Sequence, residues 1–194
     1  MNKVISLIIP SRNTLKYLKW AYTSIRKNLG YLHEICMADD FSNDGTWEWM
    51  KEISEKDKNV KIHRNDGPTR LGHTILYDTL VDMASNDIVM IFHSDMYACP
   101  NLDTEMLKHL ERGKVVSATR IEPPLHPDGP EKILKDFGIE PEEFKAEIMS
   151  PPPATEINFL SLVRLGFIFL STSSDRLAAK RNNSVIVVNS PTCL

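Results

Sequence analysis

The sequence has 194 residues, of which 42% are hydrophobic and 25% are charged. A chain of this size buries one substantial core and is short for two independent domains. Its formal net charge is −3 and its lysines and arginines are spread along the chain, which argues against a nucleic-acid partner.

The first 148 residues alternate between short apolar, β-branched runs and longer segments of helical period. This alternation is typical of an α/β fold, in which a mostly parallel sheet carries helices on both faces. The predicted strands are, in chain order, Val4–Ile9, Glu34–Ala38, Val60–His63, Ile88–Phe92 and Val115–Thr119.

Four helices are predicted between these strands. In the first, apolar residues recur every three or four positions from Leu15 to Leu29, so they form one stripe that faces the sheet. Asn13 or Thr14 is the expected N-cap of this helix. The other three helices are expected to begin near Asp44–Thr46, to run from Leu71 to Met83, and to run from Leu102 to Glu111.

Parallel strands joined by helices place their ligands at the carboxyl ends of the strands. Functional residues are therefore expected directly after each predicted strand. Those positions hold four polar segments, namely Pro10–Asn13, Asp39–Thr46, Asn65–Arg70 and His93–Tyr97.

The segment Asp39–Thr46 has three carboxylates within six residues, at a predicted turn from strand to helix. One interpretation is structural: Asp44 caps the helix, while Asp39 and Asp40 face solvent. The other is that a carboxylate at the sheet edge accepts the ring N–H of uracil or a similar base. The segment alone leaves both interpretations open.

Two segments resemble family 2 glycosyltransferases. Val4–Asn13 is similar to their opening strand, which ends in a Pro-x-x-Asn turn, and Asp39–Thr46 resembles their Asp-Asp-x-Ser-x-Asp-Gly-Thr motif. The resemblance implies the nucleotide-sugar-binding half of a Rossmann-like GT-A fold, which transfers sugar from a nucleoside diphosphate-sugar to an acceptor with inversion. The nucleotide-binding residues that it implies in these two motifs are Pro10, Ser11, Arg12, Asn13, Asp39 and Asp40.

Arg12 departs from the family, which often has an aromatic residue there to stack on the base. A guanidinium group can stack on a base as well. The base that this chain binds is therefore not predicted.

The segment Ile88–Met96 is a predicted buried strand followed by a polar turn, and it aligns with the family's Asp-x-Asp motif. A divalent ion such as Mg²⁺ or Mn²⁺, held by carboxylate oxygen, offsets the charge that develops on the leaving diphosphate. Asp95 is the predicted metal ligand, and Ser94 is assigned to nucleotide binding. His93 replaces the first acid of the motif and is either a further metal or phosphate ligand or a structural residue.

Two further segments carry weaker predictions. Arg70 follows a Gly/Pro turn at a predicted helix start and is expected to bind phosphate, the alternative being a solvated side chain. His126 and Asp128 lie in a proline-rich loop, and either is a candidate second metal ligand, because a downstream histidine does this in some relatives. The alternative for both is a surface loop. The acidic stretch Glu140–Glu147 is predicted to be a solvated helix face.

The composition changes after about residue 148, where the chain becomes poor in charge and opens with Pro151–Pro153. We expect a domain of residues 1–148 and a tail of residues 149–194 whose fold is not predicted, apart from a strand at Val185–Val188. The family has a catalytic Asp or Glu downstream, often as a Glu-Asp pair. The sequence has no such pair, and the tail has only Glu156 and Asp175 as acids. We expect a chain that is truncated or altered there.

The cysteines Cys36, Cys99 and Cys193 fit neither a disulfide framework nor a zinc cage, so a reducing, cytoplasmic location is expected. The longest apolar run of the tail, Phe159–Leu170, is well short of the roughly 20 residues that cross a bilayer. No transmembrane segment is predicted, and peripheral membrane contact stays open.

The first functional hypothesis is therefore a metal-dependent glycosyltransferase that acts on a saccharide or another hydroxyl-bearing acceptor. The second is a binding module that keeps the donor pocket but lacks the acceptor and base segment. A nucleotidyltransferase is disfavoured because Pro10–Asn13 has neither the glycine-rich loop nor the lysine that such enzymes place after the first strand.

Overall fold

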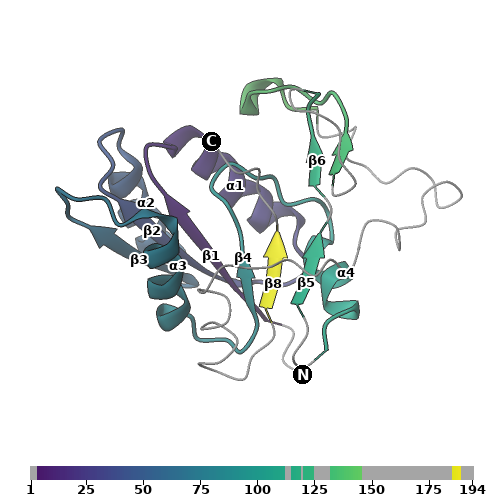
Figure 1. The fold of residues 1–194 in the computed structure, drawn as a ribbon, viewed down its shortest axis with the longest axis horizontal. Coiled ribbons are helices and arrows are strands. Elements are labelled where there is room, and N and C mark those ends of the chain that lie inside the picture. Colours follow the sequence, from purple (N-terminus) through teal and green to yellow (C-terminus); the bar gives the residue numbers. More distant parts are fainter. Residues whose placement is uncertain (1–3, 112–114, 119, 125–131, 146–184, 189–194) are drawn as a thin grey trace, which may run out of the picture.

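The computed structural model describes residues 4–111, 115–118, 120–124, 132–145 and 185–188. Its centre is a six-stranded sheet of order β3-β2-β1-β4-β8-β5, in which every pairing is parallel (Figure 1). The strands are β1 (Ser6–Ser11), β2 (Glu34–Asp40), β3 (Val60–Asn65), β4 (Val89–Ile91), β5 (Val115–Ala118) and β8 (Val185–Val188). The predicted α/β fold and its five strands are confirmed, as is the strand predicted in the tail.

Four α-helices connect these strands: α1 (Leu15–Asn28), α2 (Thr46–Lys56), α3 (Gly72–Met83) and α4 (Leu102–Lys108). The fourth helix ends three residues before its predicted end at Glu111. A separate parallel pair, β6 (Arg120–Glu122) and β7 (Lys132–Leu134), precedes the short 3-10 helix η1 (Pro141–Glu143). The predicted helix at Glu140–Glu147 is therefore reduced to one turn in its described part.

The two faces of the sheet are covered by different helices, as Figure 1 shows for α1 and α3. In β2, Ile35 and Met37 belong to the apolar cluster that contains residues of α1 and α2, whereas Cys36 and Ala38 belong to the cluster that contains residues of α3. Successive side chains of a strand point to opposite faces. By the same alternation, Asp39 extends toward the side of α1 and α2, and Asp40 toward the side of α3.

The strand order reverses at β1, which has β2 on one side and β4 on the other. In an open α/β sheet, ligands bind beyond the carboxyl ends of the strands at such a reversal. Asp39 is the last residue but one of β2 and Asp95 follows β4, so they lie on the two strands that flank β1, which are about 10 Å apart. The prediction that both residues lie at one edge of the sheet is confirmed.

The strand β8 lies between β4 and β5, so part of the segment after residue 148 belongs to the central sheet. The domain boundary at residue 148 stays a prediction. Among the described residues, no helix combines the length and the hydropathy that crossing a membrane requires.

Candidate functional site at the carboxyl edge of the sheet

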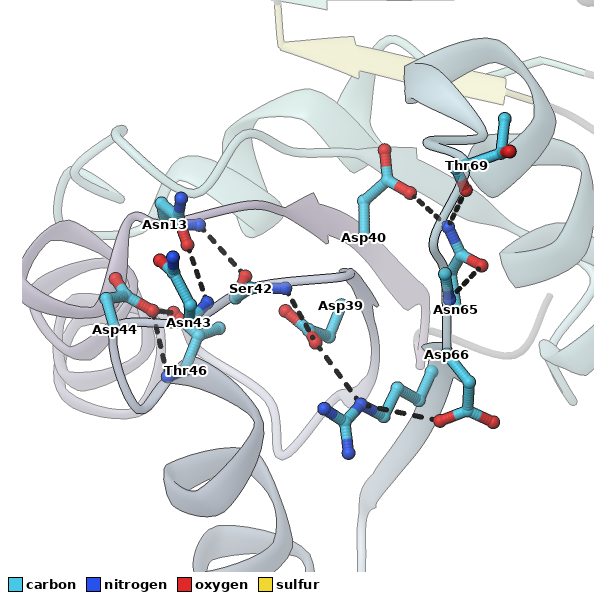
Figure 2. A network of polar contacts seen from close by, with 12 residues as sticks. Asn13, Asp39, Asp40, Ser42, Asn43, Asp44, Thr46, Asn65, Asp66 and Thr69 are labelled. Carbon is cyan, nitrogen blue, oxygen red and sulfur yellow. Dashed lines mark hydrogen bonds and ion pairs between the residues drawn. The ribbon is translucent and has the colours of Figure 1, made fainter.

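The loops after β1 and β2 are joined by reciprocal hydrogen bonds (Figure 2). The backbone N–H of Asn13 donates to Oγ of Ser42, and the backbone N–H of Asn43 donates to Oδ1 of Asn13, both at 2.9 Å. Asn13 has a positive φ of 51°, a conformation that asparagine tolerates better than most residues. In this structure Asn13 therefore fixes the two loops relative to each other.

Asp44 caps two helices at once. Its Oδ2 accepts the backbone N–H of Leu15, the first residue of α1, and its Oδ1 accepts the backbone N–H of Thr46, the first residue of α2, each at 3.0 Å. Burial would raise the pKa of Asp44, but the hydrogen bonds from Thr46 and Leu15 lower it overall. The capping interpretation is confirmed for Asp44. Thr14 is the N-cap residue of α1, as predicted, but its side chain makes no capping hydrogen bond.

Thr14 instead connects the ends of two strands. Its hydroxyl lies 2.7 Å from Oγ of Ser11, at the end of β1, and donates to Oγ of Ser94, after β4, at 3.1 Å. Ser11 and Ser94 are both buried. Two predicted nucleotide-binding residues are thus brought together beside the strand-order reversal.

Asp40 is buried and binds both the start of α3 and Asn65, the latter contact being drawn in Figure 2. It accepts the backbone N–H groups of Leu71 and Gly72, both at 3.0 Å, and Nδ2 of Asn65 at 2.7 Å. Burial would raise the pKa of Asp40, but these hydrogen bonds and the charge of Arg70 lower it. The solvent-facing interpretation is wrong for Asp40, because its carboxylate replaces water at the helix start.

Asp39 is also completely buried, so the solvent-facing interpretation is wrong for it too. Its Oδ2 accepts the backbone N–H of Ser42 at 3.3 Å, whereas its Oδ1 has no hydrogen-bond partner. A buried carboxylate oxygen without a donor is costly, and such atoms often face a ligand. Asp39 is therefore the described acid with unused hydrogen-bonding capacity at this edge.

Arg64, which the sequence analysis did not single out, faces Asp39. Its Nε lies 3.8 Å from Oδ2 of Asp39 and 3.6 Å from Oδ1 of Asp66. Its guanidinium carbon lies 5.4 Å from the centre of the Trp47 ring. The signal that could have found it is its position: it directly follows the predicted strand Val60–His63, where functional residues were expected.

Pro10 is buried in β1 opposite Ala38, and Arg12 follows this strand. Arg12 is half-buried, and its Nε has no hydrogen-bond partner. Like Oδ1 of Asp39, this atom is a polar group that the described protein leaves without a partner. Arg12 follows β1 directly, and Asp39 lies opposite Ser11 in the pairing of β1 with β2.

The turn after β4 brings His93 next to α3. Oη of Tyr77 lies 3.4 Å from Nε2 of His93, and the rings of His73 and His93 have centres 6.3 Å apart. Burial and the negative charge of the nearby Asp95 raise the pKa of Tyr77. Asp95 itself is exposed.

In the part of the chain that the structure describes, no three His, Cys, Asp or Glu side chains gather closely enough to hold a metal ion. Arg70 is exposed before the first turn of α3. His126 lies outside the described residues, so its prediction stays untested.

The segment around η1 packs beside the turn of Asp95. Phe144 has ring-centre distances of 4.4 Å to Tyr97 and 5.1 Å to Trp20, and Lys16 of α1 forms ion pairs with Glu140 and Glu142. These contacts attach the described part of the acidic stretch to α1, while Glu142 and Glu143 stay exposed to solvent. No periodic pattern in the sequence predicts this docking.

The family model described as Glycosyl transferase family 2 matches residues 6–155 of the chain. A dolichol-phosphate mannosyltransferase of Pyrococcus furiosus is 27% identical over 114 residues, which cover 58% of this chain and 32% of that protein. The match with the family model begins at the first residue of β1 and extends beyond the site described above.

Two solved structures have the same fold. Residues 1–349 of S. aureus TarS in complex with UDP-GlcNAc superpose with a TM-score of 0.54 at 18% identity, over 66% of this chain and 37% of that one. The mannosyltransferase PcManGT from Pyrobaculum calidifontis, in complex with GDP-Man and Mn²⁺, gives 0.51 at 21% identity, over 61% and 35%. The chain thus spans about a third of the length of these relatives.

Proposed function

Because the chain belongs to glycosyl transferase family 2, we propose that it transfers a sugar from a nucleoside diphosphate-sugar donor to a hydroxyl-bearing acceptor. The observation that carries this proposal is Asp39: a fully buried carboxylate with one oxygen lacking a partner, at the end of β2 beside the strand-order reversal. An ionised carboxylate there is suited to accept a ring N–H of a nucleotide base.

We assign the other predicted residues to two roles. Pro10, Ser11 and Arg12 form the neighbouring wall of the base and ribose pocket, and Arg70 binds a phosphate at the start of α3. Asn13, Asp40 and Ser94 hold the loops of this pocket through the hydrogen bonds described above. A pocket held by such bonds is largely formed before the donor binds, which lowers the entropy cost of binding.

Asp95 is the proposed ligand of Mg²⁺ or Mn²⁺. Its donor set suits these ions, since a single carboxylate with phosphate and water oxygens is a common arrangement for magnesium. The metal would neutralise charge on the leaving diphosphate. PcManGT, which was solved with GDP-Man and Mn²⁺, supports this assignment. His93 and His126 stay secondary candidates.

We propose inversion at the sugar carbon, by direct attack of the acceptor hydroxyl from the face opposite the diphosphate. We assign no catalytic base.

Peripheral contact with a membrane is compatible with the proposal. A cytoplasmic location is compatible with it too, because Cys36 and Cys99 are free thiols and burial raises the pKa of Cys99 to about 11. We expect no nucleic-acid partner.

The test is calorimetric titration with UDP, GDP and dTDP, with and without Mn²⁺, followed by an assay for sugar transfer or hydrolysis of the corresponding donors. We expect at least one nucleotide to bind more tightly with Mn²⁺ and its sugar donor to be consumed. Binding without any turnover would instead support a binding module. If none of the three diphosphates binds in the presence of metal, the proposed function is wrong.

A further inference from the structure

We propose that Arg64 is a second base-reading residue, which together with Asp39 selects bases that carry a ring N–H beside a carbonyl group. Uracil, thymine and guanine have this edge, whereas cytosine and adenine do not. The inference rests on the proposed function, because it takes Asp39 to face the base of a bound nucleotide.

The strand register places the two residues together. In the parallel pairing of β2 with β3, Asp39 lies opposite Arg64, and Asp40 lies opposite Asn65. Side chains of paired residues extend from the same face of a sheet, and the next pair extends from the other face. The second pair forms a hydrogen bond of 2.7 Å between Asn65 and Asp40, whereas the first pair stays apart at 3.8 Å.

The gap between Asp39 and Arg64 leaves hydrogen-bonding capacity on both sides. Distances of 3.8 and 3.6 Å from Nε of Arg64 to its two carboxylate neighbours exceed those of a hydrogen bond. This Nε is buried without a hydrogen-bond partner, and so is Oδ1 of Asp39. Two adjacent buried groups, one a donor and one an acceptor, are satisfied together by a ligand that offers an N–H beside a C=O.

Arg64 is held in a position suited to this role. Its side chain is 32% exposed and its guanidinium lies over the ring of Trp47, a contact that restricts the side chain without using its N–H donors. A cation at this point also compensates the charge of Asp39, which would otherwise be a buried and unpaired carboxylate. Arg64 thus places a positive charge and an N–H donor beside the acceptor.

The pair discriminates because it rejects the opposite order of groups. Cytosine and adenine present a ring nitrogen lone pair where uracil and guanine present an N–H, and an amino group where these present a carbonyl oxygen. In the same position the lone pair would face the carboxylate and the amino group would face the guanidinium. Both contacts are repulsive. A site whose buried polar groups have fixed donor and acceptor roles binds such ligands much more weakly.

The experiment measures by calorimetry the affinities of UDP, GDP, CDP and ADP for the wild-type chain and for Arg64→Gln. We expect the wild type to prefer UDP or GDP over CDP and ADP. In Arg64→Gln we expect the preferred nucleotide to bind roughly tenfold to hundredfold more weakly, and its advantage over CDP to fall toward one. Arg64→Lys, which keeps the charge without the planar donors, is expected to recover part of the affinity.

Lys51→Gln is the matched control, because Lys51 is a second cation over the ring of Trp47, at 5.9 Å, and has no ion pair with Asp39. It should leave both affinity and base preference unchanged within twofold. Circular dichroism checks that each variant is folded. If Arg64→Gln does not fold, the base preference of Arg64→Lys is compared with that of the wild type instead. An unchanged base preference in a folded Arg64 variant would overturn the inference while leaving the proposed function standing. Absence of binding by every nucleotide to the wild type would overturn both.

Discussion

Asp44 accepts a hydrogen bond from the backbone N–H of Leu15, which lies 29 positions earlier in the chain and is the first residue of α1. Its other oxygen caps its own helix at Thr46. One carboxylate thus supports two helix starts, and both lie at the edge of the sheet that carries the proposed site. The family motif contains this aspartate, and its position explains a role that is separate from ligand binding.

Replacing Asp44 by alanine is therefore expected to destabilise the protein more than loss of a single cap. Two backbone N–H groups lose their partner, so we expect the free energy of unfolding to fall by about 1–3 kcal/mol. Urea denaturation followed by circular dichroism measures this change. Asp87→Ala, at an exposed aspartate, is the control and should stay within about 0.5 kcal/mol. Similar losses in both variants would contradict the double-cap assignment.

Asp95→Ala is expected to abolish the effect of Mn²⁺ on nucleotide diphosphate binding. Since Asp95 is exposed, the free energy of unfolding should change little. Calorimetric titration with and without Mn²⁺ measures the first effect and denaturation the second. Asp128→Ala should leave the metal effect largely intact, and equal losses from the two variants would mean that the metal ligand has been misassigned.

The buried Glu34 makes stability dependent on acid pH. Burial would raise the pKa of Glu34, but hydrogen bonds from Lys61, Ser6 and Ser85 hold it at about 2, below its ordinary value of 4.5. Because the folded value is the lower one, the stabilisation is complete above pH 4.5 and is lost as the pH falls toward 2. It amounts to about 1–3 kcal/mol, since Lys61 is partly exposed.

The check on Glu34 is a comparison of unfolding free energies at pH 7 and pH 3. We expect Glu34→Gln to be less stable than the wild type at pH 7 and to lose less stability on acidification. Glu55→Gln, at an exposed position of α2, should follow the wild type. A wild type and a Glu34→Gln variant with the same slope against pH would rule out this source of acid sensitivity.

His33 and Asp103 form a fully buried pair that joins the loop before β2 to α4. Nδ1 of His33 accepts the backbone N–H of Ile5 at 3.1 Å, so Nε2 carries the proton that it donates to Asp103 at 2.7 Å. His33→Ala removes the hydrogen-bond partner of the Ile5 backbone N–H and of the Asp103 carboxylate, and it leaves a cavity. We therefore expect the free energy of unfolding, measured by urea denaturation, to fall by roughly 2–4 kcal/mol. His63→Ala, at a half-buried histidine of β3, should cost less than half as much.

The strands and helices were largely predictable because local patterns encode them. The continuous apolar run Ile35–Ala38 follows from burial of β2 on both faces, and the period of three to four in α1 follows from burial of the helix on one face, so both are visible in the order of residues. The polar turns after the strands were predictable for a related reason: in a parallel sheet they meet at one edge. Helix ends were less accurate, as the early end of α4 at Lys108 shows.

The sequence by itself determined the fold class, the edge at which the polar residues gather, and the acids that belong there. Only the tertiary structure decided which of them are free to bind: Asp40 and Asp44 serve helix starts, while Asp39 keeps an oxygen without a partner and faces Arg64. The reason is that a local pattern fixes the face of a strand on which a side chain lies. Its partner depends on strand register and on loops tens of residues away, which no local pattern records.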